Sequence, residues 1–271
     1  MAKTILITGA SSGIGKSAAR LFQQKGWNVI ATMRSPDKET ELIDLENVLV
    51  TRLDVLDIAS IEQAVEEGQK QFGQIDALLN NAGYGAYGPL EVFDRASIQR
   101  QFQTNVLGLL DVTRTVIPHF RAQQSGVIIN ISSMGGRITF PLGSLYHGTK
   151  FAVEGISEAL SFEMAQAGVR VKVVEPGLTA TDFGGRSFDF QNDETLQAYQ
   201  PLIKALFEGF EKMSGLASTP ELVAEVIYEA ATDESPRLRY RVGPDTEQLL
   251  SDRDKLGEEA FLAQQKALYG L

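Results

Sequence analysis

Cysteine is absent from this sequence of 271 residues, and histidine occurs only twice, as His119 and His147. The absence of thiols excludes disulfide bonds, thiolate metal sites and a cysteine nucleophile. A histidine-rich metal site is also disfavoured, because protein zinc sites take most of their ligands from cysteine and histidine. We therefore expect no metal.

Basic residues are outnumbered by acidic ones. The 25 Lys and Arg residues stand against 35 Asp and Glu residues, which gives a formal net charge of −10. The basic residues are scattered singly and in pairs, so the sequence offers no basic stripe for a phosphate backbone. Nucleic acid is therefore not an expected partner.

Long apolar runs are also missing. No segment approaches the roughly 20 apolar residues that a membrane-spanning helix needs. The N-terminal residues MAKTILITGASSG contain one basic residue and an apolar run of strand length only, unlike a secretion signal. These features predict a cytoplasmic protein without a membrane span.

Short apolar runs alternate along the chain with longer stretches of helical periodicity. Several runs are apolar at nearly every position, which is typical of strands covered on both faces. The predicted strands are Thr4–Thr8, Asn28–Met33, Val48–Leu53, Ala77–Asn80, Gly126–Ser132, Val169–Glu175 and Leu238–Gly243. The predicted helices are Ile14–Lys25, Ile58–Phe72, Ile98–Gln123, with a kink or early stop near Pro118, and Ser144–Ala167. This alternation predicts an α/β fold, a doubly wound Rossmann-type parallel sheet of about seven strands with helices on both faces.

No linker or internal repeat interrupts the chain, so we expect a single domain over residues 1–271. Residues 181–216 mix loop signals with helical pieces, which is typical of a substrate loop or lid; a pair of surface helices packed on the core is the alternative. The phenylalanines of this segment suit either an apolar pocket or the core: Phe183, Phe188, Phe190, Phe207 and Phe210.

A glycine-rich turn, TGASSGIG (Thr8–Gly15), connects the first predicted strand to the first predicted helix. Glycine accepts positive φ and permits close approach of other backbone. The free N–H groups at the start of the following helix suit a pyrophosphate. This position within a βαβ unit favours dinucleotide binding, with predicted contacts at Gly9, Ser11, Ser12, Gly13, Ile14 and Gly15.

The glycine spacing, G-x-x-x-G-x-G, resembles that of the short-chain dehydrogenase/reductase family, in its single-domain branch. The segments ATMRSP (31–36) and YHGTKFAVEG (146–155) together are similar to its hydroxysteroid and retinol dehydrogenase-like group. Further motifs follow in the order of that family. LDV (Leu53–Val55) is similar to its adenine contact, and NNAG (Asn80–Gly83) is similar to its turn beside the cofactor. YHGTK (Tyr146–Lys150) fits its Y-x-x-x-K motif, and PG (Pro176–Gly177) fits its nicotinamide-side loop. The resemblance implies further cofactor contacts at Asp54, Val55, Asn81, Ala82, Gly83, Tyr146, Lys150, Pro176, Gly177 and Thr179.

Tyr146 and Lys150 stand one helical turn apart, so they share a helix face. The resemblance implies hydride transfer between a nicotinamide and a carbonyl or alcohol carbon, with Tyr146 as general acid/base. It also implies that Ser133 binds the substrate oxygen and that Asn105 belongs to a water-linked proton path. Because a free tyrosine has a pKa near 10, we expect Lys150 and the positive nicotinamide ring to lower the pKa of Tyr146. We interpret His147 as a packing or surface residue.

The end of the second predicted strand bears on the choice of cofactor. Met33 stands where an acid that binds the ribose 2′-OH would be expected, and Arg34 follows it. An arginine–phosphate hydrogen bond contributes roughly 1.5–3 kcal/mol, so NADP(H) is preferred over NAD(H). Ser11 and Ser12 supply no second basic residue in the glycine turn, which weakens this preference.

The sequence therefore predicts an NADP-dependent oxidoreductase that acts on the CH–OH or carbonyl group of a small molecule with an apolar body. One alternative is a dinucleotide-binding regulatory or redox-sensing protein without turnover. Another is a related epimerase or dehydratase, which the glycine spacing and modest length disfavour. The helices predicted at 98–123 and 144–167 carry enough apolar residues for a two-fold interface, so we expect a homodimer or homotetramer.

Overall fold

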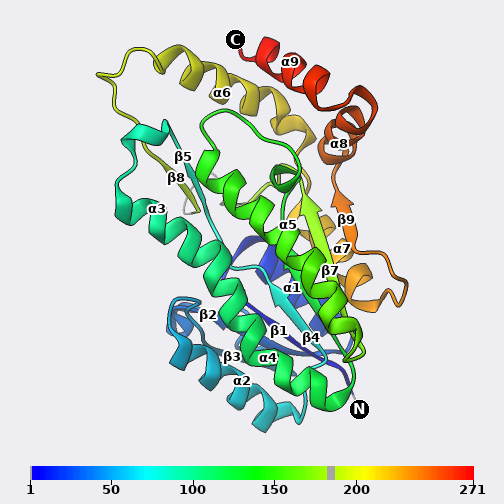
Figure 1. The fold of residues 1–271 in the computed structure, drawn as a ribbon. Coiled ribbons are helices and arrows are strands. Elements are labelled where there is room, and N and C mark those ends of the chain that lie inside the picture. The colour runs from blue at the N-terminus through cyan, green and yellow to red at the C-terminus, as the bar shows by residue number, and fades with distance from the viewer. Residues whose placement is uncertain (1, 182–186) are drawn as a thin grey trace.

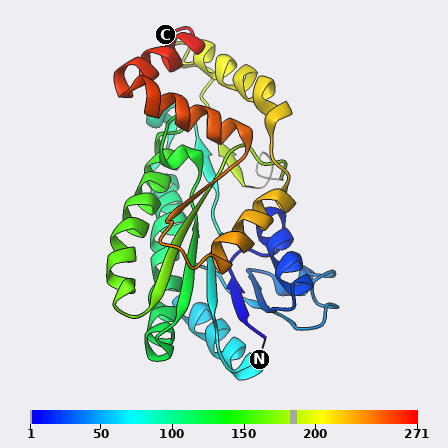
Figure 2. The same cartoon turned by 90° about the vertical axis from the view of Figure 1, so that its right-hand side faces the viewer.

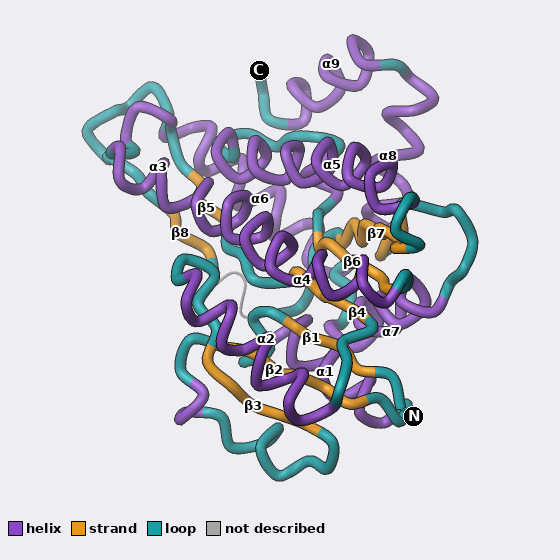
Figure 3. Tube along the Cα trace, turned by 60° about the horizontal axis from the view of Figure 1, so that its bottom comes forward, coloured by secondary structure: helices purple, strands orange, loops and turns teal. Residues whose placement is uncertain are grey.

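The computed structural model describes residues 2–181 and 187–271. Seven strands form one parallel sheet in the order β3-β2-β1-β4-β6-β7-β9, which can be followed across Figure 3 from β3 to β7. The strands are β1 (Thr4–Ile7), β2 (Asn28–Met33), β3 (Val48–Arg52), β4 (Ala77–Asn80), β6 (Gly126–Ile131), β7 (Val169–Pro176) and β9 (Arg239–Val242). The predicted doubly wound α/β fold is confirmed.

Helices cover both faces of this sheet (Figure 1). One face packs against α1 (Gly13–Gln24) and α7 (Pro220–Thr232), and the other against α2 (Ile58–Phe72), α4 (Leu109–Gln123) and α5 (Ser144–Ala165). Successive side chains of β1 alternate between the two cores, since Ile5 and Ile7 lie in the first and Leu6 in the second. This double burial explains why the central strands are apolar at nearly every position.

The helix predicted at Ile98–Gln123 is divided into α3 (Arg95–Phe102), the π-helical turn η3 (Gln103–Gly108) and α4. The backbone of Gly108 packs closely on Val55, because a Cβ on Gly108 would lie 2.7 Å from Val55 Cβ. The early stop expected near Pro118 is wrong, since α4 continues to Gln123. Proline removes one helix hydrogen bond, but this turn is held by the fully buried Val116 and Phe120.

A second parallel sheet of two strands, β5 (Gly85–Tyr87) and β8 (Phe188–Phe190), was not predicted. The pairing holds the chain that follows β4 beside the chain that precedes α6 (Gln200–Met213). Beyond β9 the chain forms α8 (Pro244–Leu256) and α9 (Glu258–Leu268). Figures 1 and 2 show α6 and α9 at the opposite end of the molecule from the start of β1. Short 3-10 turns occur at η1 (Pro36–Lys38), η2 (Leu90–Val92), η4 (Met134–Gly136) and η6 (Ser214–Leu216).

Candidate active site

The glycine turn after β1 has the shape of an anion cradle. Gly9 and Gly13 adopt φ values of 69° and 52°, which favour glycine. A Cβ on Gly15 would lie 2.3 Å from the carbonyl oxygen of Gly9, so the first turn of α1 packs directly on the loop. Ser12, the N-cap of α1, makes no side-chain capping bond to any described residue. The first N–H groups of α1 therefore fit the pyrophosphate of a dinucleotide.

The turn after β4 is tied to this glycine loop. The side-chain amide of Asn81 donates to the carbonyl oxygens of Thr8 and Gly9 at 2.9 and 3.1 Å. The main-chain N–H groups of Asn81 and Ala82 donate to Thr8 Oγ1 at 2.9 and 3.1 Å. Gly83 lies beside Asn105, since a Cβ there would be 3.1 Å from Asn105 Oδ1.

The ends of β2 and β3 bring the remaining predicted nucleotide contacts to the same edge of the sheet. Met33 pairs with Arg52 across these strands, and Asp54 and Val55 follow β3 directly. Arg34 is exposed and forms no side-chain hydrogen bond or ion pair within residues 2–181 and 187–271. Its guanidinium therefore has no protein partner in that part of the chain.

Lys16, the basic residue next to the glycine turn in the sequence, is paired with two acids. Its ammonium lies 3.2 Å from Glu39 Oε2 and 2.9 Å from Glu41 Oε1. Glu39 also accepts hydrogen bonds from the backbone of Glu41 and Leu42. Arg34 is consequently better placed than Lys16 to meet an additional phosphate.

The fold brings Ser133, Tyr146 and Lys150 together at the carboxyl ends of β6 and β7. Ser133 follows β6 and is hydrogen-bonded to the Tyr146 phenol; its hydroxyl also faces the carbonyl oxygen of Pro176 at 3.3 Å. The Lys150 ammonium donates to the carbonyl oxygen of Ile131 at 2.8 Å and lies 5.8 Å from the centre of the Tyr146 ring. This arrangement places a hydroxyl, a phenol and a cation around one point.

Burial dominates the acid–base properties of this group. It raises the pKa of the Tyr146 phenol, while the hydrogen bond with Ser133 acts in the opposite direction. It lowers the pKa of Lys150 to about 8, against the charge of Glu154. The lowered phenol pKa that we expected from Lys150 is therefore not produced by the protein alone.

Asn105 lies in the π-helical turn η3, and its side chain is fully engaged. Nδ2 donates to the carbonyl oxygen of Tyr84 at 2.8 Å and to Thr149 Oγ1 at 3.0 Å, and Oδ1 accepts from the N–H of Tyr84 at 3.1 Å. The side chain thus connects η3 to α5 and to the chain after β4. π-helical turns are frequent at functional sites.

The loop after β7 is held by Asp245, a residue that the sequence analysis missed. A Cβ on Gly177 would lie 2.2 Å from Asp245 Oδ1, and Asp245 Oδ2 accepts a 2.7 Å hydrogen bond from the N–H of Leu178. Thr179 Oγ1 donates to the carbonyl oxygen of Gly177 at 3.2 Å. No local pattern marks Asp245, because its role depends on the end of β7 reaching the start of α8.

The same loop reaches the glycine turn. A Cβ on Gly13 would lie 3.2 Å from Cγ2 of Thr181. Thr181 therefore lies against the cradle, and the start of the predicted lid contacts the predicted phosphate site.

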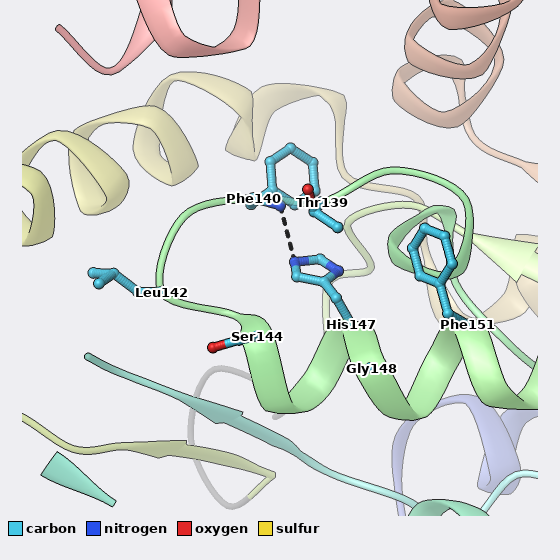
Figure 4. Close-up of a pocket in the computed structure, with 7 residues that line it drawn as sticks. All are labelled: Thr139, Phe140, Leu142, Ser144, His147, Gly148 and Phe151. Atoms are coloured by element: carbon cyan, nitrogen blue, oxygen red, sulfur yellow. Dashed lines mark hydrogen bonds between the residues drawn. The ribbon is translucent and has the colours of Figure 1, made fainter. Parts of the chain in front are cut away.

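His147 is 2 % exposed, which confirms the packing interpretation. Its Nε2 accepts a hydrogen bond from the N–H of Phe140 at 3.0 Å, drawn as a dashed line in Figure 4. Nδ1 lies 2.8 Å from the carbonyl oxygen of Gly135, so this nitrogen carries the proton. Burial lowers the pKa of His147 to about 4. The neutral ring fastens the chain between β6 and α5 onto the helix that carries Tyr146.

Aromatic side chains form a wall next to Tyr146. The ring of Tyr87, in β5, is centred 5.5 Å from the Tyr146 ring, 5.2 Å from Phe188 and 6.2 Å from Phe210. Phe190 extends this wall from Phe188, with which it is stacked, to Phe207 at 5.0 Å. Phe183 lies outside the described residues. Tyr87 was missed because a three-residue strand leaves no periodic signal.

A pocket of about 420 Å³ lies on another side of α5 (Figure 4). Its helical lining residues are Ser144, His147, Gly148 and Phe151. This i, i+3, i+4, i+7 pattern marks one helix face, and Tyr146 and Lys150 lie on the other side of the helix. The pocket is therefore not the apolar pocket that we predicted beside the phenol.

Within the described part of the chain, no three His, Asp or Glu side chains cluster in a way that could hold a metal ion. No helix there is both long and apolar enough to cross a membrane.

Comparison with known proteins identifies the family. Residues 3–192 match the family model described as short chain dehydrogenase. The chain belongs to the short-chain dehydrogenase family. An uncharacterised oxidoreductase of Schizosaccharomyces pombe is 46 % identical over 239 residues, which cover 88 % of this chain and all of the relative.

Two solved structures support the same conclusion. A short-chain dehydrogenase from Streptomyces avermitilis superposes with a TM-score of 0.83 at 32 % identity, covering 97 % of this chain and 98 % of the other. The structure of ElxO with NADP bound gives a TM-score of 0.73 at 30 % identity, covering 89 % of this chain and 98 % of ElxO. The predicted family resemblance is therefore confirmed.

Proposed function

We propose that this short-chain dehydrogenase transfers a hydride between NADP(H) and the carbonyl or alcohol carbon of a small molecule with an apolar body. The observation that carries the proposal is the meeting of Ser133, Tyr146 and Lys150 beside the loop of Gly177, at the sheet edge that also bears the glycine turn. Ligands of open α/β sheets bind at this edge.

The bound nicotinamide would supply or accept the hydride. In the direction of reduction, Tyr146 donates its phenolic proton to the carbonyl oxygen, and in oxidation it removes the proton of the alcohol. Ser133 hydrogen-bonds the same oxygen and holds it where charge develops. Lys150 stabilises the phenolate that remains after proton donation, because its cation lies close to the Tyr146 ring.

The dinucleotide would lie across the glycine turn, with Gly9, Ser11, Ser12, Gly13, Ile14 and Gly15 around the pyrophosphate. Asp54 and Val55 would contact the adenine side, and Asn81, Ala82, Gly83, Pro176, Gly177 and Thr179 the nicotinamide side. Arg34 supports the preference for NADP(H), since its exposed guanidinium suits the 2′-phosphate. The related ElxO was solved with NADP bound.

The aromatic wall supports the proposal of an apolar substrate. Tyr87 packs beside the Tyr146 ring, and Phe188 and Phe210 pack on Tyr87, whereas the polar groups are concentrated around Ser133 and Lys150. A substrate with one oxygen function and an apolar body fits this division. We propose that residues 181–216 serve as the lid of this site within a single domain.

A regulatory dinucleotide-binding protein is the alternative function. It is disfavoured because all of Asn105, Ser133, Tyr146 and Lys150 are present.

We further propose a homodimer or homotetramer, since α3, η3 and α5 expose Phe102, Leu107, Phe151 and Phe162. The cytoplasmic location stays a prediction.

The test is a panel of ketones, aldehydes and alcohols, followed by NAD(P)H absorbance with the wild-type protein and with Tyr146→Phe. We expect turnover of apolar carbonyl compounds by the wild type and a loss of about 10²- to 10⁴-fold in the variant, with NADPH affinity retained. Tight NADPH binding without turnover across the panel would support the regulatory alternative instead.

A further inference from the structure

Two buried carboxyl groups lie next to the proposed catalytic residues. Glu154 is on α5, one turn after Lys150, and Glu175 is in β7, directly before Pro176. They are 5 % and 0 % exposed. Among the described residues, Glu154 Oε1 and Glu175 Oε2 have no hydrogen-bond partner, and neither has the buried hydroxyl of Ser132. Buried carboxylate oxygens without partners are costly, so this cluster calls for an explanation.

The carboxyl groups of Glu154 and Glu175 face one common cation. Arg239 Nε lies 2.9 Å from Glu154 Oε2 and 3.6 Å from Glu175 Oε1. Arg137 lies 3.3 Å from the same oxygen of Glu175. Arg239 also pairs at 2.6 Å with Glu158, which is exposed at the next turn of α5. The two carboxyl groups are therefore close neighbours in a site that excludes water.

Two ionised carboxylates in such a place repel each other, and one of them retains a proton to higher pH. Burial, together with the charge of Glu154, raises the pKa of Glu175 to about 7. The charge of Glu154 acts on Lys150 as well, where it opposes the effect of burial. Glu154 is thus coupled to Glu175 on one side and to Lys150 on the other.

We propose that Glu154 and Glu175 are positioning residues: Glu175 holds a proton, and the negative charge of Glu154 keeps the Lys150 ammonium charged. The charged groups facing this pair are Lys150 and Glu158 from α5, Arg137 from the chain after η4, and Arg239 from β9. The inference rests on the proposed function, because Lys150 matters to catalysis only if Tyr146 is the acid/base.

The charge of Lys150 can be measured directly, without turnover. We would label the lysines with ¹³C at the ε position, assign the Lys150 resonance with Lys150→Met, and titrate it by NMR in the wild type and in Glu154→Gln. The titration midpoint should fall by about one pH unit in Glu154→Gln, because an opposite charge has been removed. Glu158→Gln is the matched control, since it removes the exposed partner of the same arginine and should leave the midpoint in place.

The proton on Glu175 can be detected separately, by infrared spectroscopy. Infrared difference spectra between nearly neutral and alkaline pH, a range in which ordinary carboxyl groups stay ionised, should show a protonated-carboxyl C=O band in the wild type that disappears in Glu175→Gln. If Glu154→Gln does not fold, Glu175→Gln still tests the inference, because a carboxyl C=O band that persists in Glu175→Gln overturns it.

An unchanged Lys150 midpoint in folded Glu154→Gln also overturns the inference. Turnover of the substrate panel would then leave the proposed function intact. If instead the midpoint falls while no compound in the panel is turned over, the carboxyl pair acts as inferred and the proposed function fails. In an active enzyme, the alkaline limb of the kcat profile should move to lower pH in Glu154→Gln, a change that loss of stability alone would not produce.

Discussion

The carboxylate of Asp245 lies directly against Gly177, so closely that a Cβ on the glycine would be 2.2 Å from Asp245 Oδ1. Asp245 is 2 % exposed and accepts hydrogen bonds from the N–H groups of Leu178 and Thr246 at 2.7 and 2.9 Å. The start of α8 thereby fixes the loop that follows β7. The proposed nicotinamide side of the site thus depends on a helix formed by the last part of the chain.

Replacing Asp245 by alanine should loosen this loop. The buried N–H of Thr246 and the partly buried N–H of Leu178 would lose their acceptor, which costs about 1–3 kcal/mol for a buried unsatisfied group. We expect a lower free energy of unfolding and weaker NADPH binding, measured by denaturant titration and by fluorescence of the bound cofactor. Asp252→Ala, on the same helix, is the control. Equal stability and equal affinity of the two variants would contradict this role.

Gly15→Ala should abolish the dinucleotide site. The new Cβ would lie 2.3 Å from the carbonyl oxygen of Gly9 and 2.6 Å from Asn81 Nδ2, so the loop and its tie to Asn81 must move apart. We expect at least a tenfold loss of NADPH affinity by isothermal calorimetry. Gly155→Ala in α5 is the matched control, because nothing lies within 4 Å of its added methyl and alanine favours the helix. Wild-type affinity in Gly15→Ala would show that the cradle is not the binding site.

Arg34→Asp should shift cofactor preference from NADPH toward NADH. Loss of an arginine–phosphate bond of roughly 1.5–3 kcal/mol corresponds to about a tenfold to hundredfold lower ratio of kcat/KM values. The paired change Met33→Asp with Arg34→Asp is the fuller version of this test. Met33 is only 3 % exposed, however, so an aspartate there would be buried, and the single variant is cleaner. Lys38→Ala, on the same exposed segment, controls for general loss of positive charge. An unchanged NADPH/NADH selectivity in Arg34→Asp would rule out Arg34 as the contact of the 2′-phosphate.

His147 should make the protein sensitive to acid. Its pKa is about 4 when folded and near 6.5 when unfolded, so the unfolded state binds more protons between these values. The stability from the neutral ring is complete above pH 6.5 and is lost as the pH falls toward 4, by up to about 3 kcal/mol. Urea unfolding across this range should show the slope in the wild type and in His119→Gln, and a reduced slope in His147→Gln. An identical slope in all three would mean that His147 is not the group responsible.

The parts of this protein that were predictable from sequence are those with a local signal. Strands buried on both faces must be apolar throughout, and the turn at Gly9–Gly15 requires glycine at fixed positions. The spacing of Tyr146 and Lys150 follows from one helical turn, whereas Ser133 was assigned from the family resemblance. These features depend on residues that are close together in the chain.

The missed features depend on contacts between distant segments. In the sequence, Asp245 looks like an ordinary acidic residue near the start of a helix. Its burial against Gly177 arises only because the fold brings the start of α8 to the end of β7. Tyr87 gains its position from pairing of β5 with β8, two strands of three residues each. Glu154 and Glu175 look like surface acids in the sequence, and only the packing of α5 on β7 and β9 buries them together.

The central claim is that the Tyr146 phenol becomes acidic when the nicotinamide is bound, although burial in the protein alone raises its pKa. The direct measurement is an ultraviolet titration of phenolate absorbance, wild type minus Tyr146→Phe, with and without NADP⁺. We predict a midpoint above the ordinary value near 10 without the cofactor and several pH units below it with NADP⁺ bound. A midpoint that stays near or above 10 in the NADP⁺ complex would contradict the account.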